Sequence, residues 1–246
     1  MGSVWSSPER PAYPHQALAV VLQVRVRRLH VMLWERPNEP FAGAWALPGG
    51  PLLAEETLGA SVARQLAAKV EVEVLGHLEQ LETRSDPGRD PRGRTVATAY
   101  LGLIPAHLDP ALPEDTAWHP VDALPPTAFD HGSMVRSALD RLRAKLSYTN
   151  VGFALAPPEF TIAELRELYV AALGYDVTAT NLQRVLLRRG VLEPTGEQAA
   201  SGRAGGRPAA LHRFVTPELA VTDPFAVFRP PSRDPDGQSR SPGYEG

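Results

Sequence analysis

The segment that most constrains the fold spans residues 49–72, where two glycines precede a helical pattern. Its apolar residues recur every four positions, which is typical of a helix that buries one face in a core: Leu58, Val62, Leu66 and Val70. Positions 65, 68 and 69 are also neighbours on such a helix, because they are spaced i, i+3 and i+4. They are Gln65, Ala68 and Lys69, so they bring together an amide, a methyl group and an ammonium. The pattern predicts a packed helix over 56–70 with no carboxylate at these three positions.

The surrounding segments predict a mixed sheet. Strand patterns, in which apolar residues alternate or β-branched residues cluster, occur in residues 16–34, 70–84 and 95–105. The first of them holds a short basic turn with Arg25, Arg27 and Arg28. Residues 134–146 form an amphipathic helical pattern. Together these segments indicate an α+β protein in which helices cover a partly antiparallel sheet, and the first domain ends near Ser147.

Length and composition limit the class of protein. The chain has 246 residues, 43% of them apolar, which suffices for two domains with their own cores. It has no cysteine, which excludes disulfides and thiolate metal sites, and its histidines are too scattered to predict a zinc site. No run of about 18 apolar residues and no signal-peptide pattern is present, so we expect no membrane span and a cytoplasmic location. The net charge of −3 means that nucleic-acid binding requires a local basic patch.

A second domain follows Ser147 and begins with two short helical patterns. Residues 160–174 contain the capping-box pair Thr161 and Glu164 and end at Gly174, a typical helix stop. Another helix is predicted from near Thr180 to Gly190. Two short helices across a tight turn predict a helix-turn-helix.

The outward face of the second helix, together with the segment after it, is basic. Two strand patterns flank a flexible loop that carries Arg203 and Arg207, as expected for a wing. From 181 to 213 the chain has six arginines and two glutamates, a local net charge of +4. Such a cluster favours contact with the DNA backbone, although a solvated basic face would show the same composition.

A second basic segment, residues 84–94, lies between two predicted strands. Its four arginines are suited to charge-assisted hydrogen bonds with a diphosphate: Arg84, Arg89, Arg92 and Arg94. Its composition also fits a solvated hairpin in which the arginines pair with the aspartates of the same loop.

Residues 49–72 resemble the Nudix box, whose pattern is G-x5-E-x7-R-E-U-x-E-E-x-G-U with U a bulky aliphatic residue. The positions that match are Gly50, Glu56, Arg64, Leu66 and Val72. Gln65, Ala68 and Lys69 stand where the family has three metal-binding glutamates, and Glu71 replaces the glycine. The preceding WERPNEPFAGAWALPGG also resembles the entry into a Nudix box. Because Mg²⁺ takes oxygen ligands, the resemblance implies a Nudix-like fold with no bound metal and no catalytic residue.

The resemblance extends to LEQLETRSDPGRDPRGR, AFDH at 128–131 and FTIAEL at 160–165, which are similar to the Nudix-related transcriptional regulators of NAD metabolism. It implies a Nudix-like αβα sandwich with a mixed sheet, followed by a winged helix-turn-helix. The implied protein is a homodimeric repressor of NAD biosynthesis or salvage genes. It binds palindromic double-stranded operator DNA and needs no cofactor, and ADP-ribose or a related nucleotide regulates it without being hydrolysed. The expected divisions are a flexible N-terminus 1–12, a ligand-sensing domain 13–147, a DNA-binding domain 148–216 and a mobile tail 217–246.

The resemblance also assigns site residues. The expected ligand-binding residues are Arg36, Phe41, Trp45, Gly49, Gly50, Arg84, Arg89, Arg92 and Arg94. The expected DNA-binding residues are Thr180, Asn181, Arg184, Arg188, Arg203, Arg207 and Arg213. Of these, Asn181 and Arg184 are expected to read bases, and the remaining arginines are expected to contact phosphates.

Two other functions remain open from the sequence. The chain could be an ADP-ribose pyrophosphatase that holds Mg²⁺ with other carboxylates, such as Glu55, Glu56, Glu71 or Glu82. Alternatively, its second domain could bind protein, which would make the chain a nucleotide-binding adaptor.

Overall fold

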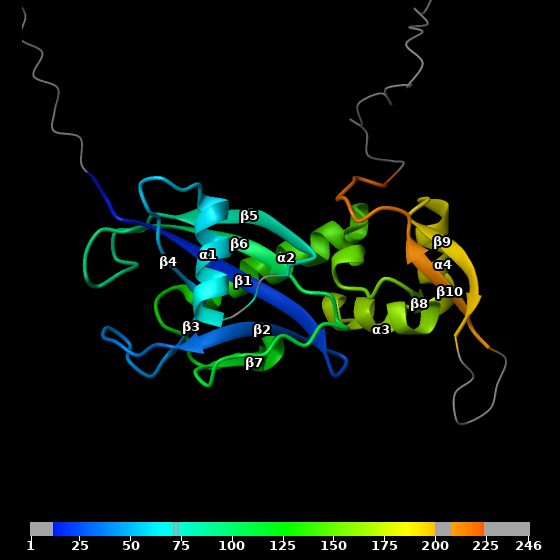
Figure 1. Cartoon of the computed structure of the whole chain (residues 1–246), viewed down its shortest axis with the longest axis horizontal. Helices are drawn as coiled ribbons and strands as arrows, with labels where there is room; N and C mark the ends of the chain where they lie inside the picture. Colours follow the sequence, from blue (N-terminus) through cyan, green and yellow to red (C-terminus); the bar gives the residue numbers. More distant parts are fainter. Residues whose placement is uncertain (1–11, 71, 73, 200–207, 224–246) are drawn as a thin grey trace, which may run out of the picture.

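The computed structural model describes residues 12–70, 72, 74–199 and 208–223 (Figure 1). A mixed sheet with its helices occupies one end of the molecule, and a smaller helical unit with its own short sheet occupies the other. No helix in these ranges combines the length and apolar composition that a membrane crossing requires.

The larger sheet has seven strands, five of which lie in the order β3-β2-β1-β6-β5, while β4 pairs with β1 and β7 with β2. The strands are β1 (His15–Arg25), β2 (Arg28–Glu35), β3 (Trp45–Ala46), β4 (Gly49–Pro51), β5 (His77–Arg84), β6 (Val96–Leu103) and β7 (Thr116–Pro120). Only the β1–β6 pair is parallel, and the other pairs of this sheet are antiparallel. The expected mixed, partly antiparallel sheet is confirmed.

Strand β1 runs through the centre of the sheet, and its side chains alternate between two cores. Leu18, Val20, Leu22 and Val24 point into the larger core, and Ala17, Ala19 and Val21 into the smaller one. Because both faces of β1 are covered, its sequence is almost continuously apolar rather than alternating.

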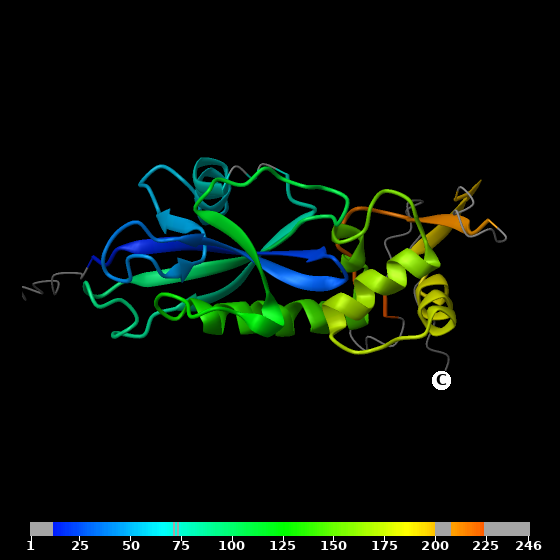
Figure 2. The ribbon, with the colours of Figure 1, turned by 90° about the horizontal axis from the view of Figure 1, so that it is seen from below.

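One helix covers each face of the sheet (Figure 2). Helix α1 (Leu58–Val70) buries Val62, Leu66 and Val70 against one face, as its four-residue spacing predicted. Helix α2 (His131–Tyr148) packs on the other face through residues such as Met134, Ala138 and Leu142. It starts earlier than the expected 134–146 and ends at the expected domain boundary.

Some expected bounds differ from the structure. The alternation over 70–84 predicted one strand, but β5 begins only at His77, and residues 72 and 74–76 are irregular. Strands β3, β4 and β7 are too short, or too weakly patterned, to have been predicted. Alternation in sequence fits a strand only where a neighbouring strand is available for pairing, and this is decided by the tertiary structure.

The smaller unit is a winged helix. It consists of η2 (Val151–Ala154), β8 (Phe160–Thr161), α3 (Ile162–Leu173), α4 (Ala179–Arg188), β9 (Leu192–Gln198) and β10 (Ala210–Phe214), with the sheet order β8-β10-β9. The expected capping box at Thr161 and Glu164 is present, and Gly174 ends α3 with φ 80°. Strand β9 extends through Gln198, further than the sequence predicted.

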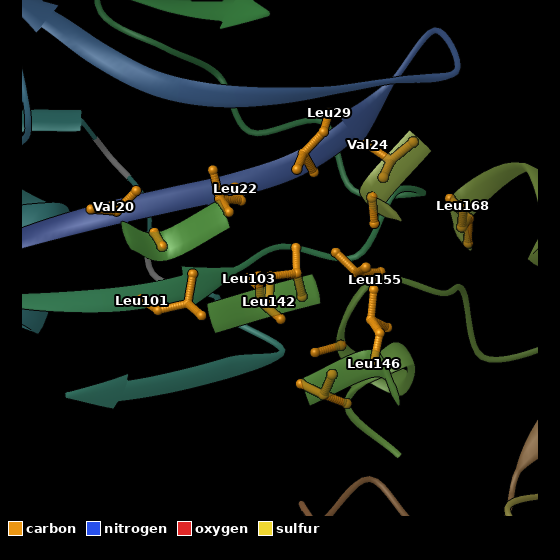
Figure 3. Packing of buried hydrophobic residues seen from close by; sticks show 14 of the residues in the cluster. Val20, Leu22, Val24, Leu29, Leu101, Leu103, Leu142, Leu146, Leu155 and Leu168 are labelled. Atoms are coloured by element: carbon orange, nitrogen blue, oxygen red, sulfur yellow. The ribbon is translucent and has the colours of Figure 1, made fainter. Parts of the chain in front are cut away.

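The larger core of the sheet continues into the winged helix, so the two units share this core (Figure 3). Val24 and Leu29 of the sheet and Leu146 of α2 belong to the same buried cluster as Leu155 and Leu168 of the winged helix. The short turn η1 (Val121–Ala123) adds Val121 to the edge of this cluster. A shared core ties the position of the winged helix to that of the sheet.

The chain after the winged helix returns to the junction between the units. Asn150 donates its side-chain amide to the carbonyl of Glu218 at 2.8 Å and accepts from the backbone of Ala220 at 2.7 Å. Val221 forms a bridge with Thr149. These contacts hold residues 218–221, at the start of the expected tail 217–246, against the end of α2.

Candidate functional site

A cleft of about 230 Å³ lies at the end of the sheet that is farthest from the winged helix. It is formed by the start of β1, the end of β2, strand β4, α1, the 84–94 loop and the start of α2. Its polar lining consists of Gln16, Arg36, Asn38, Glu39, Lys69, Arg92 and His131. The volume falls just below the roughly 300–1,000 Å³ typical of small-molecule sites, so the cleft suits part of a nucleotide.

The two glycines of β4 allow two close contacts, between Gly49 and β1 and between Gly50 and Gln65 of α1. A Cβ atom on Gly50 would lie 2.4 Å from Nε2 of Gln65, and one on Gly49 would lie 2.4 Å from the carbonyl oxygen of Ala17. Gln65 is buried beneath β4, while Ala68 is exposed on α1. Glycine at 49 is therefore required by packing against the backbone of β1, whether or not it contacts a ligand, whereas a larger residue at 50 would require the Gln65 side chain to move.

Lys69 reaches from α1 into the cleft. Its Nζ donates to the carbonyl oxygen of Gly49 at 2.6 Å and lies 4.4 Å from the centre of the Trp34 ring. Burial lowers the pKa of Lys69, and the positive charges of Arg36 and Arg64 lower it further. Within the described ranges, no carboxylate lies within ion-pairing distance of Lys69.

At another part of the cleft, two arginine side chains lie over the ring of Phe129. The guanidinium of Arg36 lies 4.8 Å from the centre of its ring, and that of Arg92 lies 5.6 Å away. Among the described residues, the side chain of Arg36 donates only to the backbone carbonyls of Pro40 and Asn38. Burial and the neighbouring Arg92 lower the pKa of Arg36. Two cations held close together around one ring would be stabilised by an anion.

The four arginines of the 84–94 loop are not gathered at the cleft. Arg92 lines it and forms a bidentate pair with Asp90, with contacts of 2.7 and 3.0 Å. The remaining three occupy other surroundings: Arg89 is buried against Asp130, Arg84 pairs with Glu82, and Arg94 stacks on Tyr13. One arginine of the loop, Arg92, therefore pairs with an aspartate of the same loop, as the composition allowed.

The two aromatic residues expected to stack on a base lie beside the cleft rather than in its lining. Phe41 is 42% exposed and packs edge-on against Phe129, with ring centres 4.9 Å apart. Trp45 lies on β3 with its ring 4.3 Å from that of His119. Of the expected ligand residues, those that line the cleft are Arg36, Gly49, Gly50 and Arg92.

Several cleft residues were absent from the expected set. In the sequence, Lys69 stands out only as the replacement of a metal-binding glutamate, and Phe129 and His131 only as part of the AFDH resemblance. The sequence signals that could have indicated these cleft residues were the position of Lys69 on the helix of the Nudix box and the AFDH segment. Trp34 was also absent from the set, although it begins the WERPNEPFAGAWALPGG segment that resembles the entry into a Nudix box.

The floor of the cleft is fixed by two side chains that hold the backbone of Leu47. The Trp34 indole donates to the Leu47 carbonyl at 3.1 Å, and the Leu47 amide donates to Nδ1 of His131 at 3.0 Å. Burial lowers the pKa of His131 to about 3. The ring is therefore neutral near pH 7.

The carboxylates named for a possible metal site are engaged elsewhere or exposed. Glu56 accepts two hydrogen bonds from Arg64, at 2.5 and 2.9 Å, and these lower the pKa of Glu56 to about 2. Glu82 pairs with Arg84, Glu55 is exposed, and Glu71 lies outside the described residues. Within the described part of the chain, no three histidine or carboxylate side chains are placed to hold a metal ion.

The recognition helix α4 has one buried face and one exposed face. Thr178 caps it by accepting from the amide of Asn181, and Leu182 and Leu186 are buried. The expected DNA-facing side chains are all exposed: Thr180, Asn181, Arg184 and Arg188. Arg184 donates to Oδ1 of Asn181 at 2.8 Å, which holds the two groups side by side. Such a pair can read adjacent base edges in a major groove.

Of the DNA-binding arginines expected in the wing, one lies among the described residues. Arg213 on β10 is exposed and donates to Glu193 on β9 at 2.7 Å. Arg203 and Arg207 lie outside the described residues.

The fold and these two sites define a Nudix domain joined to a DNA-binding winged helix. A family model described as NUDIX domain matches residues 14–138, and one described as NrtR DNA-binding winged helix domain matches residues 152–214. The "ADPR responsive transcriptional repressor NtrR" of Acinetobacter baylyi is 32% identical over 90% of this chain and 91% of its own length. The chain belongs to the NrtR family.

Two further proteins show the same likeness in part or in whole. The crystal structure of Shewanella oneidensis NrtR with a 27mer DNA matches with a TM-score of 0.72 and 34% identity, covering 82% of this chain and 93% of that one. An ADP-ribose pyrophosphatase of Methanocaldococcus jannaschii is 32% identical over 50% of this chain and 73% of its own length. The Nudix domain alone is therefore similar to an enzyme, and the whole chain is similar to repressors.

Proposed function

We propose that this protein is a transcriptional repressor that binds operator DNA through α4 and is regulated by an ADP-ribose-type nucleotide bound in the cleft without hydrolysis. The observation that carries the proposal is the position of Lys69. Its ammonium lies between Gly49 and Trp34, at the place where the box of a Nudix enzyme carries a metal-binding carboxylate. A cation there attracts the anionic ligand directly and repels the metal that hydrolysis would require.

The strength of this repulsion supports binding without hydrolysis. An ammonium about 4 Å from a divalent ion is repelled by roughly 8 kcal/mol at an effective dielectric near 20. Gln65 and Ala68 offer no carboxylate to offset it. The phosphates of a nucleotide instead meet Lys69, Arg36 and Arg92, whose donors suit phosphate oxygens.

DNA binding is supported by the exposed face of α4 and by the printed descriptions of relatives. The Shewanella relative was crystallised with DNA, and the Acinetobacter relative is described as a repressor that responds to ADPR. We propose that two copies of this chain bind a palindromic operator, because helix-turn-helix proteins usually place two recognition helices one helical turn apart. The controlled genes would be those of NAD biosynthesis or salvage.

A gel-shift titration tests the proposal. Operator fragments are first selected from genomic DNA, and the bound genes identify the pathway. We expect millimolar ADP-ribose to change operator affinity and to remain intact. Unchanged operator affinity at that concentration would exclude ADP-ribose as the effector.

The similarity to a pyrophosphatase makes hydrolysis the second candidate function. Incubation with ADP-ribose and Mg²⁺, followed by measurement of AMP, separates the two. Turnover on the order of 1 per second would establish an enzyme. A repressor that only binds the nucleotide yields no AMP above that of a sample without protein.

A further inference from the structure

His131 is a buried histidine that lines the cleft with only one ring nitrogen satisfied. It is the first residue of α2, and only 3% of its surface is exposed. The amide of Leu47 donates to its Nδ1 at 3.0 Å. Its Nε2 has no hydrogen-bond partner among the described residues.

The contact with Leu47 fixes where the proton of the ring lies. A nitrogen that accepts a hydrogen bond from an amide carries no proton, so a neutral ring has its proton on Nε2. Burial lowers the pKa of His131; Arg89 and Arg36 lower it further, and Asp130 and Asp90 oppose the shift. The ring is therefore neutral and presents an Nε2–H donor.

The ring cannot turn to satisfy this donor without a cost. A flip would move Nδ1 away from the Leu47 amide and leave that buried donor unpaired. The Leu47 backbone is itself held by the Trp34 indole, which donates to its carbonyl. The contacts of Leu47 thus keep the unpaired Nε2–H in place, and a buried donor of this kind calls for a partner.

The neighbours of His131 indicate which kind of partner fits. Its ring centre lies 5.3 Å from that of Phe129, the same ring over which Arg36 and Arg92 lie. An acceptor close to these two cations would be stabilised by a negative charge. Phosphate oxygens combine that charge with strong acceptor capacity.

We propose that Nε2–H of His131 donates a hydrogen bond to a phosphate oxygen of the nucleotide in the cleft. This inference rests on the proposed function and adds a residue that selects the ligand by a directed hydrogen bond rather than by charge. Lys69, Arg36 and Arg92 attract the diphosphate, and His131 fixes its orientation.

A matched pair of variants separates this role from a structural one. In His131→Asn, the amide oxygen takes the place of Nδ1 and still accepts from Leu47, but the donor at Nε2 is lost. In His131→Gln, the amide nitrogen takes the place of Nε2, but the acceptor for Leu47 is lost. A structural role predicts that Asn is the milder change, and a ligand-binding role predicts that Asn is the more harmful one for the nucleotide.

Calorimetric titration of the full chain with ADP-ribose, without Mg²⁺, measures the difference. We expect His131→Asn to bind about tenfold more weakly than the wild type, and His131→Gln to bind within a few-fold of it. Thermal unfolding is recorded in parallel to confirm that both variants are folded. Wild-type affinity in a folded His131→Asn overturns the inference. A folded His131→Gln that binds no better than His131→Asn also overturns it.

Nitrogen-15 NMR of histidine-labelled protein gives a second readout, with the His131 signal identified by its loss in His131→Asn. We expect a neutral ring protonated on Nε2, whose proton signal moves downfield when ADP-ribose or millimolar pyrophosphate is added. A shift with ADP-ribose but not with pyrophosphate would place the acceptor outside the phosphates and overturn the assignment. Absence of any ADP-ribose binding by the wild type would instead refute the proposed effector, and this inference with it.

Discussion

The cleft and the recognition helix are both basic, but they hold their arginines differently. In the cleft, Arg92 is paired with Asp90 and Arg36 is held by the backbone carbonyls of Pro40 and Asn38, while Arg89 pairs with Asp130 beside the cleft. On α4, Arg184 donates a hydrogen bond to the neutral Asn181, and among the described residues neither Arg184 nor Arg188 has a carboxylate within ion-pairing distance. Paired arginines form a rigid frame for a small ligand of fixed shape. Unpaired arginines remain available for phosphates and base edges on DNA.

Two elements connect these regions. Helix α2 begins at His131 in the cleft and extends about 27 Å, at 1.5 Å per residue, to the winged helix, where Arg143 donates to the carbonyl of Ala172 on α3. The β1–β2 hairpin begins beside the cleft and ends at Arg27, which forms a bidentate pair with Glu167 on α3 at 2.6 and 3.0 Å. A ligand that shifts either element changes the position of α3 and, through it, α4.

The largest expected effect is the change with pH in the stability that the buried His131 contributes. Because the pKa of folded His131 is lowered to about 3, the unfolded chain takes up its proton first as the pH falls below about 6.5. The contribution of His131 to stability is thus complete above pH 6.5 and is lost progressively toward pH 3. We expect the stability difference between the wild type and His131→Asn to move against the wild type by about 2–3 kcal/mol between pH 7 and pH 4.5.

Urea unfolding of both proteins at the two pH values measures this change, and the difference between them cancels the contributions of other titrating groups. A difference that stays constant with pH would mean that the pKa of His131 is the same in the folded and the unfolded chain, and would contradict the lowered pKa.

The next effect is the loss of operator affinity on replacing Arg184 of the recognition helix. Arg184→Ala should weaken binding to the selected operator by about 1–3 kcal/mol and change binding to random DNA much less, because a bidentate base contact is lost. Arg188→Ala serves as the matched control. Loss of a phosphate contact should weaken binding to operator and random DNA alike and lower the slope of affinity against salt concentration by about 1. Equal losses on operator and random DNA for Arg184→Ala would place it on the backbone instead.

A substitution of Lys69 in the cleft should have an effect of similar size on nucleotide binding. Lys69→Gln removes a charged donor and should weaken ADP-ribose binding by about 1.5–3 kcal/mol. Arg64→Ala, on the same helix, is the control, because Arg64 pairs with Glu56 and does not line the cleft. Calorimetric titration compares the three proteins. If Arg64→Ala weakened binding as much as Lys69→Gln, a general loss of positive charge would explain the effect.

The smallest expected effect lies at the tip of the connecting hairpin. Val26 and Arg27 have φ of 46° and 59°, and Val26 is 93% exposed. A β-branched residue is strained in this left-handed region, whereas asparagine is tolerated there. Val26→Asn should therefore raise the free energy of unfolding by about 1 kcal/mol. Thermal unfolding measures the change, and Val221→Asn, at another exposed valine without such a φ, should bring no gain.

The sequence alone determined the two-domain organisation and the helices that carry it. The four-residue stripe of α1 and the capping box of α3 are local patterns, and they form wherever a core accepts their apolar faces. It also determined that no carboxylate stands at positions 65, 68 and 69, since this is a matter of residue identity.

Only the tertiary structure decided which arginines reach the cleft and what surrounds them. The 84–94 loop presents four arginines in sequence, but three of them find other partners, including Asp130, which is 41 residues from Arg89. The donor state of His131 likewise depends on Leu47, 84 residues away. Local propensity selects helices and strands, whereas pairing between charges and hydrogen-bond partners depends on distances that exist only after the sheet and its helices have packed.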